Sequence, residues 1–430
     1  MRASDRMARL MGRSFLPAAV LLLIGPLCAC AERTRGQAET FLAEPIACPA
    51  GPGSRLPRWG RDPAGRHLLG WVEEGREGEG SATARFRFAH LGPEGFGPVR
   101  LVAGGEDWFL NWADFPAIAA LDDRNLLAHF LQRSADGTYD YQVMIVRSSD
   151  GGATWSEPAR LHADPGPGEH GFVSLVPIDA TRFAAVWLDG RGTAGHGAGG
   201  EPGAMSLYLR TVGTDGALGD EVLLDDRVCD CCPTSAVRTP DGALLVAYRD
   251  RTGNEVRDVS VVRVEEGAVS SAWTSADGWR IAGCPVNGPV LCAWGGRIAL
   301  AWFTLGSDGA GRVLVAFSED GGRTFSPPAR IAGEPTSGRV DAVFDGEGRL
   351  VVAWLATDAG KEAWRVARID PSGRASEVQV AAETSGTRES GLARLASTDE
   401  GIVLAFTGVE GGARVALRRL SWRSPARGRP

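Results

Sequence analysis

A short apolar segment that recurs seven times constrains the fold of this 430-residue chain more than any other feature. Most copies follow a turn pair such as Asp-Gly or Gly-Arg and end in a small residue followed by an aromatic one. The copies occupy residues 68–71, 126–129, 184–187, 245–248, 299–302, 351–354 and 403–406. Their last residues stand 58, 58, 61, 54, 52 and 52 positions apart, which is the length of one four-stranded unit.

This period predicts an all-β chain folded as a β-propeller with seven four-stranded blades. Continuous apolar runs suit strands that are buried on both faces between neighbouring blades. In each blade we expect an inner strand A, the recurrent segment as strand B, and then strands C and D. The last unit lacks an evident strand D. Residues 41–47, which precede the first unit, are expected to supply it and to close the ring.

Two eight-residue turns repeat each other. Residues 148–155 read Ser-Ser-Asp-Gly-Gly-Ala-Thr-Trp, and residues 318–325 read Ser-Glu-Asp-Gly-Gly-Arg-Thr-Phe. The Asp side chain can accept hydrogen bonds from the turn, and the glycines supply positive φ; the aromatic residue should pack back under the hairpin. These turns resemble the Asp-box (BNR) repeat of the sialidase-like β-propellers. The resemblance implies structural turns, and it makes six blades the alternative to seven.

The N-terminal residues read as an export signal. Four arginines precede an apolar run over residues 15–27 that is too short to span a bilayer comfortably. Leu-Cys-Ala-Cys at residues 27–30 resembles a bacterial lipobox, which implies lipidation of Cys30; an ordinary signal peptide cut nearby is the alternative. We therefore expect a signal peptide over residues 1–29, a tether over 30–40, a propeller over 41–422 and a disordered tail over 423–430. The protein would be anchored at the cell envelope, with the outer membrane or periplasm favoured.

The net charge of the chain limits which partners it can bind. Residues 1–29 hold four arginines and one aspartate, so their removal changes the formal charge from −7 to −7 − 3 = −10. Such acidity disfavours nucleic acid as a partner. We expect a monomer that needs no cofactor and that contacts the membrane through its lipid.

Arginines gather at one predicted rim. In an antiparallel blade the start of strand A and the end of strand B lie at the same rim, so residues there from every blade face one funnel. The ligand-binding residues predicted on this basis are Arg55, Arg191, Arg249, Asn287, Arg339 and Arg394. A guanidinium group binds carboxylate, sulfate or phosphate bidentately, which predicts an anionic ligand. The alternative is that these arginines pair with neighbouring aspartates and tie the blades together.

A second resemblance concerns Arg55. Ser-Arg-Leu-Pro at residues 54–57 resembles the Arg-Ile-Pro motif that opens sialidase domains, which implies that Arg55 begins their carboxylate-binding arginine triad. Arg191 or Arg249, and Arg339 or Arg394, would complete it. The family's mechanism also uses a Tyr paired with a Glu late in the propeller and an early Asp acid/base. The chain has four tyrosines, Tyr139, Tyr141, Tyr208 and Tyr248, and none of them lies in the last three units. In this respect the chain departs from the family.

Four further residues at this rim are candidate catalytic groups. Asp114, Glu169 and Asp189 offer carboxylates for a hydrolytic scheme, and His170 offers an acid/base; each can equally serve as a loop residue with structural partners. Two functions follow. One is an exo-α-sialidase-type glycoside hydrolase acting on an acidic glycan, and the other is a non-catalytic propeller that binds a glycan or protein through the same funnel. The missing late tyrosine favours binding.

The cysteines suggest a third class of function. Cys229, Cys231 and Cys232 crowd into one loop, and Cys284 follows one blade later. Because both segments enter strand A in adjacent blades, we predict a disulfide between Cys284 and one of the three. A copper or zinc site on the thiolates of a metal-handling surface protein is the alternative.

Overall fold

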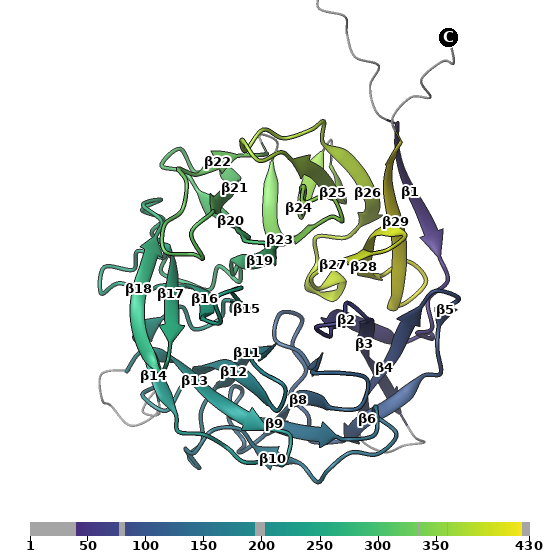
Figure 1. Cartoon of the computed structure of the whole chain (residues 1–430), viewed down its shortest axis with the longest axis vertical. Coiled ribbons are helices and arrows are strands. Elements are labelled where there is room, and N and C mark those ends of the chain that lie inside the picture. Colours follow the sequence, from purple (N-terminus) through teal and green to yellow (C-terminus); the bar gives the residue numbers. More distant parts are fainter. Residues whose placement is uncertain (1–39, 77–81, 194–202, 333–334, 359, 424–430) are drawn as a thin grey trace, which may run out of the picture. The chain divides into compact units, whose positions relative to one another are not determined.

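The computed structural model describes residues 40–76, 82–193, 203–332, 335–358 and 360–423. Cys30, the predicted signal peptide and nearly all of the predicted tether and tail lie outside these residues. The described part folds as a ring of seven antiparallel sheets around a central axis (Figure 1). The predicted seven-bladed β-propeller is therefore confirmed. No helix among the described residues is long and apolar enough to cross a membrane.

The first three blades follow the chain in order, each from its inner strand outward. The first contains β2 (Ser54–Arg61), β3 (His67–Arg76), β4 (Ala82–Gly92), β5 (Gly95–Phe96) and β6 (Arg100–Gly105). Its outer position is shared, because β5 and β6 both pair with β4. The second contains β7 (Ala117–Ala120), β8 (Leu126–Arg133), β9 (Tyr141–Ser148) and β10 (Ala159–Arg160). The third contains β11 (His170–Pro177), β12 (Arg182–Asp189), β13 (Met205–Gly213) and β14 (Val222–Val228).

The next three blades have the same order. The fourth contains β15 (Ser235–Arg238), β16 (Leu244–Arg249), β17 (Val259–Glu265) and β18 (Ala268–Thr274). The fifth contains β19 (Val290–Trp294), β20 (Arg297–Leu305), β21 (Gly311–Ser318) and β22 (Ala329–Arg330). The sixth contains β23 (Thr336–Phe344), β24 (Leu350–Asp358), β25 (Lys361–Ile369) and β26 (Gln379–Thr384). A short 3-10 helix, η1 (Arg388–Ser390), leads into the seventh blade.

The seventh blade joins the two ends of the propeller. Its sheet is ordered β27 (Arg394–Thr398), β28 (Gly401–Gly408), β29 (Arg414–Arg423) and β1 (Thr40–Ile46). β1 pairs with β29 from Thr40 opposite Arg423 to Ile46 opposite Leu417. The first strand of the propeller therefore supplies the outer strand of its last blade, as predicted, and no blade is left with an incomplete edge.

The recurrent segments form the second strand of every blade and supply the core. The residues that end them are all buried: Trp71, His129, Trp187, Tyr248, Trp302, Trp354 and Phe406. They pack between neighbouring sheets, and Trp71 of the first blade packs with Val403 and Leu417 of the seventh. The period of 52 to 61 residues thus reflects one interblade aromatic layer per blade.

The two repeated turns have matching geometry. In the first, the Thr154 amide and hydroxyl donate to the two carboxylate oxygens of Asp150, at 2.9 and 2.6 Å. In the second, Thr324 donates to Asp320 at 3.0 and 2.6 Å. One detail differs from the prediction. Trp155 packs edge-to-face on Phe88 of the preceding blade, with ring centroids 6.1 Å apart, rather than under its own hairpin.

Candidate functional site

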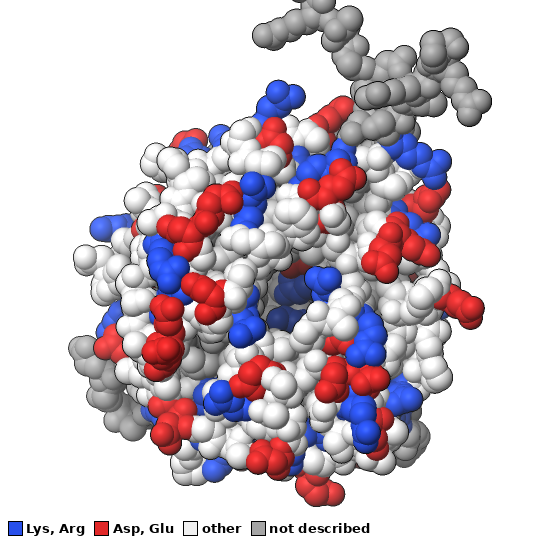
Figure 2. Space-filling model, in the orientation of Figure 1, with Lys and Arg blue, Asp and Glu red and all other residues white. Residues whose placement is uncertain are grey.

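A cavity of about 190 Å³ lies on the propeller axis, where inner strands of several blades meet. Arg58 reaches it from the first blade, Thr234 and Ser235 from the fourth, Asp341 from the sixth and Arg394 from the seventh. In the space-filling view, basic side chains are visible inside the central hollow (Figure 2). The predicted convergence of inner strands on one polar centre is therefore observed, and its charge is mainly positive.

The backbone at this centre repeats an unusual feature. Leu56, Phe172 and Arg339 have φ values of 58°, 54° and 53°, which non-glycine residues rarely adopt. Each lies at a β-bulge, where the register between the first and second strands of its blade shifts. A bulge redirects the side chains that follow it. Arg58 and Asp341 come two residues after such positions, which explains how they reach the axis.

Arg58 is the least satisfied charge of the cavity. Its guanidinium group lies 5.9 Å from the centre of the Phe115 ring, and that of Arg394 lies 5.7 Å from the same ring. Burial first, and the positive charge of Arg394 second, lower the pKa of Arg58 to about 10. Within the described residues the Arg58 guanidinium makes neither a hydrogen bond nor an ion pair.

Asp341 neutralises only part of this charge. Its Oδ1 lies 3.6 Å from Nη1 of Arg394, and its Oδ2 accepts the Leu395 amide at 2.6 Å. Burial raises the pKa of Asp341 above its ordinary value. Three arginines and one carboxylate line the cavity, namely Arg58, Arg339, Arg394 and Asp341, and this imbalance favours an anion.

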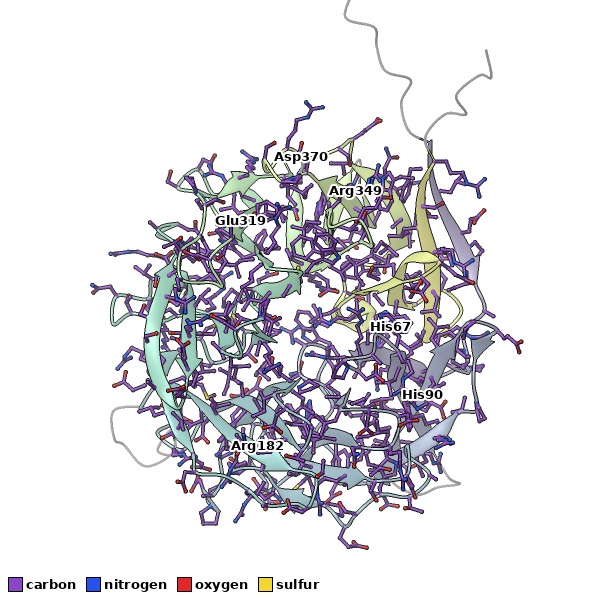
Figure 3. The ribbon with its side chains drawn as sticks, viewed as in Figure 1. His67, His90, Arg182, Glu319, Arg349 and Asp370 are labelled. Carbon is purple, nitrogen blue, oxygen red and sulfur yellow. The ribbon has the colours of Figure 1, made fainter. Side chains whose placement is uncertain are left out.

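Some charged side chains at the periphery form ion pairs, unlike Arg58. Arg182, Glu319 and Arg349 lie far from the axis (Figure 3). Each has an oppositely charged partner within 2.8 Å: Asp179, Arg297 and Asp345 respectively. These three peripheral side chains are therefore paired, whereas the Arg58 guanidinium in the axial cavity is not.

Arg339 and Asn287 line the cavity as predicted, but their polar groups bind other parts of the chain. The Arg339 guanidinium donates to the carbonyls of residues 386, 387 and 391 and to Ser390 Oγ, at 2.9–3.1 Å. It also lies 4.6 Å from the centre of the Trp112 ring. Asn287 Oδ1 accepts the Arg339 amide at 2.7 Å. Both residues hold the bulge and the loop before the seventh blade in place.

Three other arginines predicted as ligand contacts do not line the cavity. Arg55 forms an ion pair with Glu74. Arg191 forms a bidentate pair with Asp189, with both N–O distances 2.7 Å, and also contacts Glu221 at 2.9 Å. Arg249 is buried and donates to the carbonyls of Asn287, Arg257 and Phe303 at 2.6–2.7 Å. The structure therefore brings two of the five predicted arginines to the cavity, because local carboxylates and carbonyls bind the other three.

Two of the predicted catalytic carboxylates meet at one tyrosine. The Tyr141 hydroxyl lies 2.9 Å from Glu169 Oε1 and 3.1 Å from Asp114 Oδ2. The Tyr141 ring stacks on Phe109 at 3.9 Å, and Asp114 also accepts the Phe172 amide at 2.8 Å. Asp114 and Arg58 interact electrostatically, so this cluster adjoins the arginine cavity.

The cluster of Asp114, Tyr141 and Glu169 holds an extra proton near neutral pH. A phenol has one hydrogen, so it can donate to one carboxylate and must accept a hydrogen bond from the other, which has to be protonated. Burial is the largest cause that raises the pKa of Glu169 to about 8 and that of Asp114 to about 7. Burial also raises the pKa of Tyr141 well above its ordinary value. Such a shared proton suits a general acid.

The other two predicted catalytic residues support the fold around this cluster. Asp189 accepts the Trp187 indole N–H at 2.7 Å in addition to the two bonds from Arg191. His170 stacks on His162 with ring centroids 3.8 Å apart, and its Nε2 lies 3.5 Å from Asp189. Both residues are fully buried. Neither residue lines the cavity, and His170 Nδ1 lies 3.3 Å from the backbone carbonyl oxygen of Tyr141.

Sequence reasoning missed Arg58 and the pairing of Tyr141. Arg58 follows Arg55 by three positions on the same inner strand, and only the bulge at Leu56 shows which of the two faces the axis. The family pattern places the tyrosine late in the propeller, whereas Tyr141 begins β9 in the second blade. Its bridge to Glu169, at the start of the third blade, could be seen only in the structure.

The cysteine loop lies beside the cavity, because Pro233 and Thr234 continue from it into the lining. Cys284 lies next to Cys231, so the predicted proximity of the two segments is observed. The structure does not show the predicted disulfide, because its six described cysteines are free thiols. Cys231 also lies beside Cys229 and Cys232, so four thiols gather where one disulfide was predicted.

Comparisons with known proteins identify similar folds. No protein-family model matches the chain, and no curated protein matches it. Similar solved structures include a protein of unknown function from Dyadobacter fermentans (13% identity, 90% of this chain, 100% of that chain, TM-score 0.47). The Hadza microbial sialidase Hz136 is 13% identical over 79% of this chain and 73% of its own, with a TM-score of 0.45. A GH93 α-L-arabinofuranosidase of Fusarium graminearum, in complex with arabinobiose, is 13% identical over 90% and 98%, with a TM-score of 0.49.

Proposed function

We propose that this propeller is a sialidase-like protein that binds the acidic end of a glycan in its axial cavity. Arg58 and Arg394 would hold the carboxylate of a terminal sugar. The observation that carries the proposal is the Arg58 guanidinium, which lies in the cavity without a hydrogen bond or ion pair to any described residue. A partly buried cation without a partner is costly, and a bound carboxylate offsets that cost with charge-assisted hydrogen bonds.

The size of the cavity supports recognition of one terminal group. Ligand pockets typically measure about 300–1,000 Å³, whereas this cavity measures about 190 Å³. It can accept a carboxylate and part of one sugar ring, with the rest of the glycan outside. Anionic ends of the sialic acid or uronic acid type fit this description.

Hydrolysis is a second candidate function, and the cluster of Asp114, Tyr141 and Glu169 favours it. A tyrosine paired with a glutamate, beside an aspartate that can hold a proton, provides the group types that sialidase chemistry uses. Tyr141 would act as the nucleophile with Glu169 as its base, and Asp114 as the acid. Tyr141 is 1% exposed and Asp114 is 2% exposed, which leaves little access for a substrate. We therefore propose binding as the main function and hydrolysis as the second candidate.

The test of binding is a titration of N-acetylneuraminic acid and glucuronic acid by calorimetry. Arg58→Met removes the charge and keeps the apolar stem. We expect binding to weaken about 10- to 100-fold, which corresponds to about 1.5–3 kcal/mol. Arg61→Met is the matched control, because Arg61 is exposed at the end of the same strand. Equal affinities for the two variants would contradict the proposal, and release of the fluorophore from a fluorogenic sialoside would add hydrolysis to it.

We also propose that the protein is exported and anchored through a lipid on Cys30. The basic and apolar succession that ends in Leu-Cys-Ala-Cys is the support. Replacing Cys30 by Ser should move the protein from the membrane fraction to the soluble fraction of the cell envelope. Cys48→Ser is the control, and a Cys30→Ser variant that stays with membranes would refute the anchor.

A further inference from the structure

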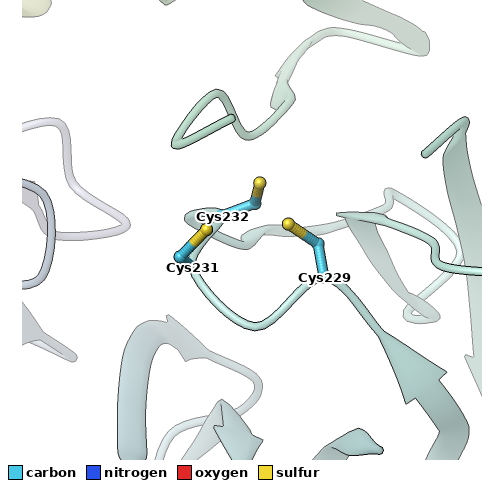
Figure 4. Close-up of side chains that lie close together, drawn as sticks. All are labelled: Cys229, Cys231 and Cys232. Carbon is cyan, nitrogen blue, oxygen red and sulfur yellow. The ribbon is translucent and has the colours of Figure 1, made fainter. Parts of the chain in front are cut away.

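The loop between β14 and β15 gathers three thiols. The sulfur atoms of Cys229, Cys231 and Cys232 all lie within 4.8 Å of one another. Figure 4 shows the three cysteine side chains close together on this loop. Cys229 and Cys232 are each 1% exposed, and Cys231 is half-buried. The three side chains therefore converge on one small space that is accessible from the side of Cys231.

A fourth thiol reaches the group from the neighbouring blade. Cys284 precedes β19 and is exposed, and it lies next to Cys231 but outside the group of three sulfurs that are all within 4.8 Å of one another. The four cysteines thus come from two loops that enter adjacent inner strands. This arrangement leaves one sulfur at the surface, where it can meet an incoming ion.

Two positively charged arginines lie near the cysteine loop, and positive charge stabilises thiolates. Arg257 is 2% exposed, and its Nε and Nη1 atoms have no hydrogen-bond partner among the described residues. Its charge acts on Cys229, and the charge of Arg249 acts on Cys232. A buried guanidinium group with unused donors next to thiols offsets the negative charge that those thiols carry when they bind a metal.

We propose that Cys229, Cys231 and Cys232 bind one soft closed-shell metal ion, Cu(I) or Zn²⁺, with Cys284 as a fourth ligand. Thiolates select these ions. For a metal–sulfur distance of about 2.3 Å, the sulfurs of a trigonal or tetrahedral site stand about 3.8–4.0 Å apart, which agrees with the observed limit of 4.8 Å. Each cysteine binds as a thiolate and releases its proton to solvent.

The number of sulfurs that bind separates the two ions. Zn²⁺ in a structural site takes four ligands, so it needs Cys284. Cu(I) is satisfied by three thiolates and does not need it. The metal site does not depend on the glycan proposal, because none of its four cysteines lines the axial cavity.

The experiment uses the reduced full chain, titrated with Zn²⁺ against a chromogenic chelator and, without oxygen, with Cu(I) against a competing ligand. We expect one ion per chain, with sulfur scatterers at about 2.3 Å by X-ray absorption. Cys231→Ser should weaken binding by more than the 10- to 100-fold typical of a lost outer-shell partner, while Cys48→Ser binds as the wild type does. Cys284→Ser should weaken Zn²⁺ binding and leave Cu(I) binding unchanged.

Two results would overturn the metal site. One is the finding that the reduced wild-type protein binds neither Zn²⁺ nor Cu(I) at one ion per chain. The other is stoichiometric binding that survives Cys231→Ser. The melting temperature of Cys231→Ser without metal, and its titration with N-acetylneuraminic acid, show whether the variant is folded. A failure of metal binding with intact sugar binding therefore refutes this inference alone.

Discussion

Arg58 and Arg339 both line the axial cavity, yet their guanidinium groups are used differently. Arg339 donates four hydrogen bonds to the loop before the seventh blade, whereas Arg58 donates none to a described residue. The sequence predicts that arginines collect at this rim. It does not predict which of them is free, because most of the carbonyls that bind Arg249 and Arg339 come from segments 38 to 54 positions away in the sequence.

The shared proton of the cluster of Asp114, Tyr141 and Glu169 makes a prediction about pH. The pKa of Glu169 is raised from 4.5 to about 8, so the folded protein keeps a proton that the unfolded chain releases. Stability should therefore fall as the pH rises from about 5 to about 8. The melting temperature of Glu169→Gln should fall less over this interval than that of the wild type. Equal slopes for the wild type, Glu169→Gln and the exposed control Glu157→Gln would contradict the assignment.

At the scale of elements, strands and turns were largely predictable, and bulges were not. The recurrent apolar segments lie within β3, β8, β12, β16, β20, β24 and β28 because a strand between two blades must be apolar on both faces. The bulges at Leu56, Phe172 and Arg339 have no comparable pattern in the sequence. Each places a bulky residue at positive φ, a conformation that costs about 1–3 kcal/mol and that only the surrounding packing enforces. The positions that face the axis depend on these bulges, so the sequence alone could not assign them.

The repeated turns carry a prediction about packing. Gly152 has a φ of 81°, and a Cβ atom there would collide with the Phe88 ring of the preceding blade. Gly152→Ala should therefore cost about 1–3 kcal/mol through backbone strain, with a further loss if the ring must move. Gly253→Ala is the control, since Gly253 has open space around its Cα and no positive φ. Denaturant unfolding measures both variants. A stability of Gly152→Ala equal to that of the control would show that this turn does not seal the two blades.

At the scale of the whole molecule, the ring explains why distant residues form one site. Arg58 and Arg394 lie more than 300 positions apart in the sequence, and they meet over Phe115 because β1 closes the seventh blade against the first. The count of seven recurrent segments predicted the ring, and antiparallel pairing predicted the shared rim. The chemistry at the axis required the structure, because it depends on side chains from the first, second, sixth and seventh blades at once.

The central claim is that this axis binds a carboxylate, and a crystal structure of the protein with N-acetylneuraminic acid tests it most directly. We predict that the carboxylate of the sugar lies between Arg58 and Arg394, with N–O distances of about 2.7–3.2 Å. Asp341 should keep its contact with Nη1 of Arg394, which is 3.6 Å from its Oδ1 without the sugar. A sugar bound elsewhere on the propeller, with Arg58 still without a partner, would contradict the claim.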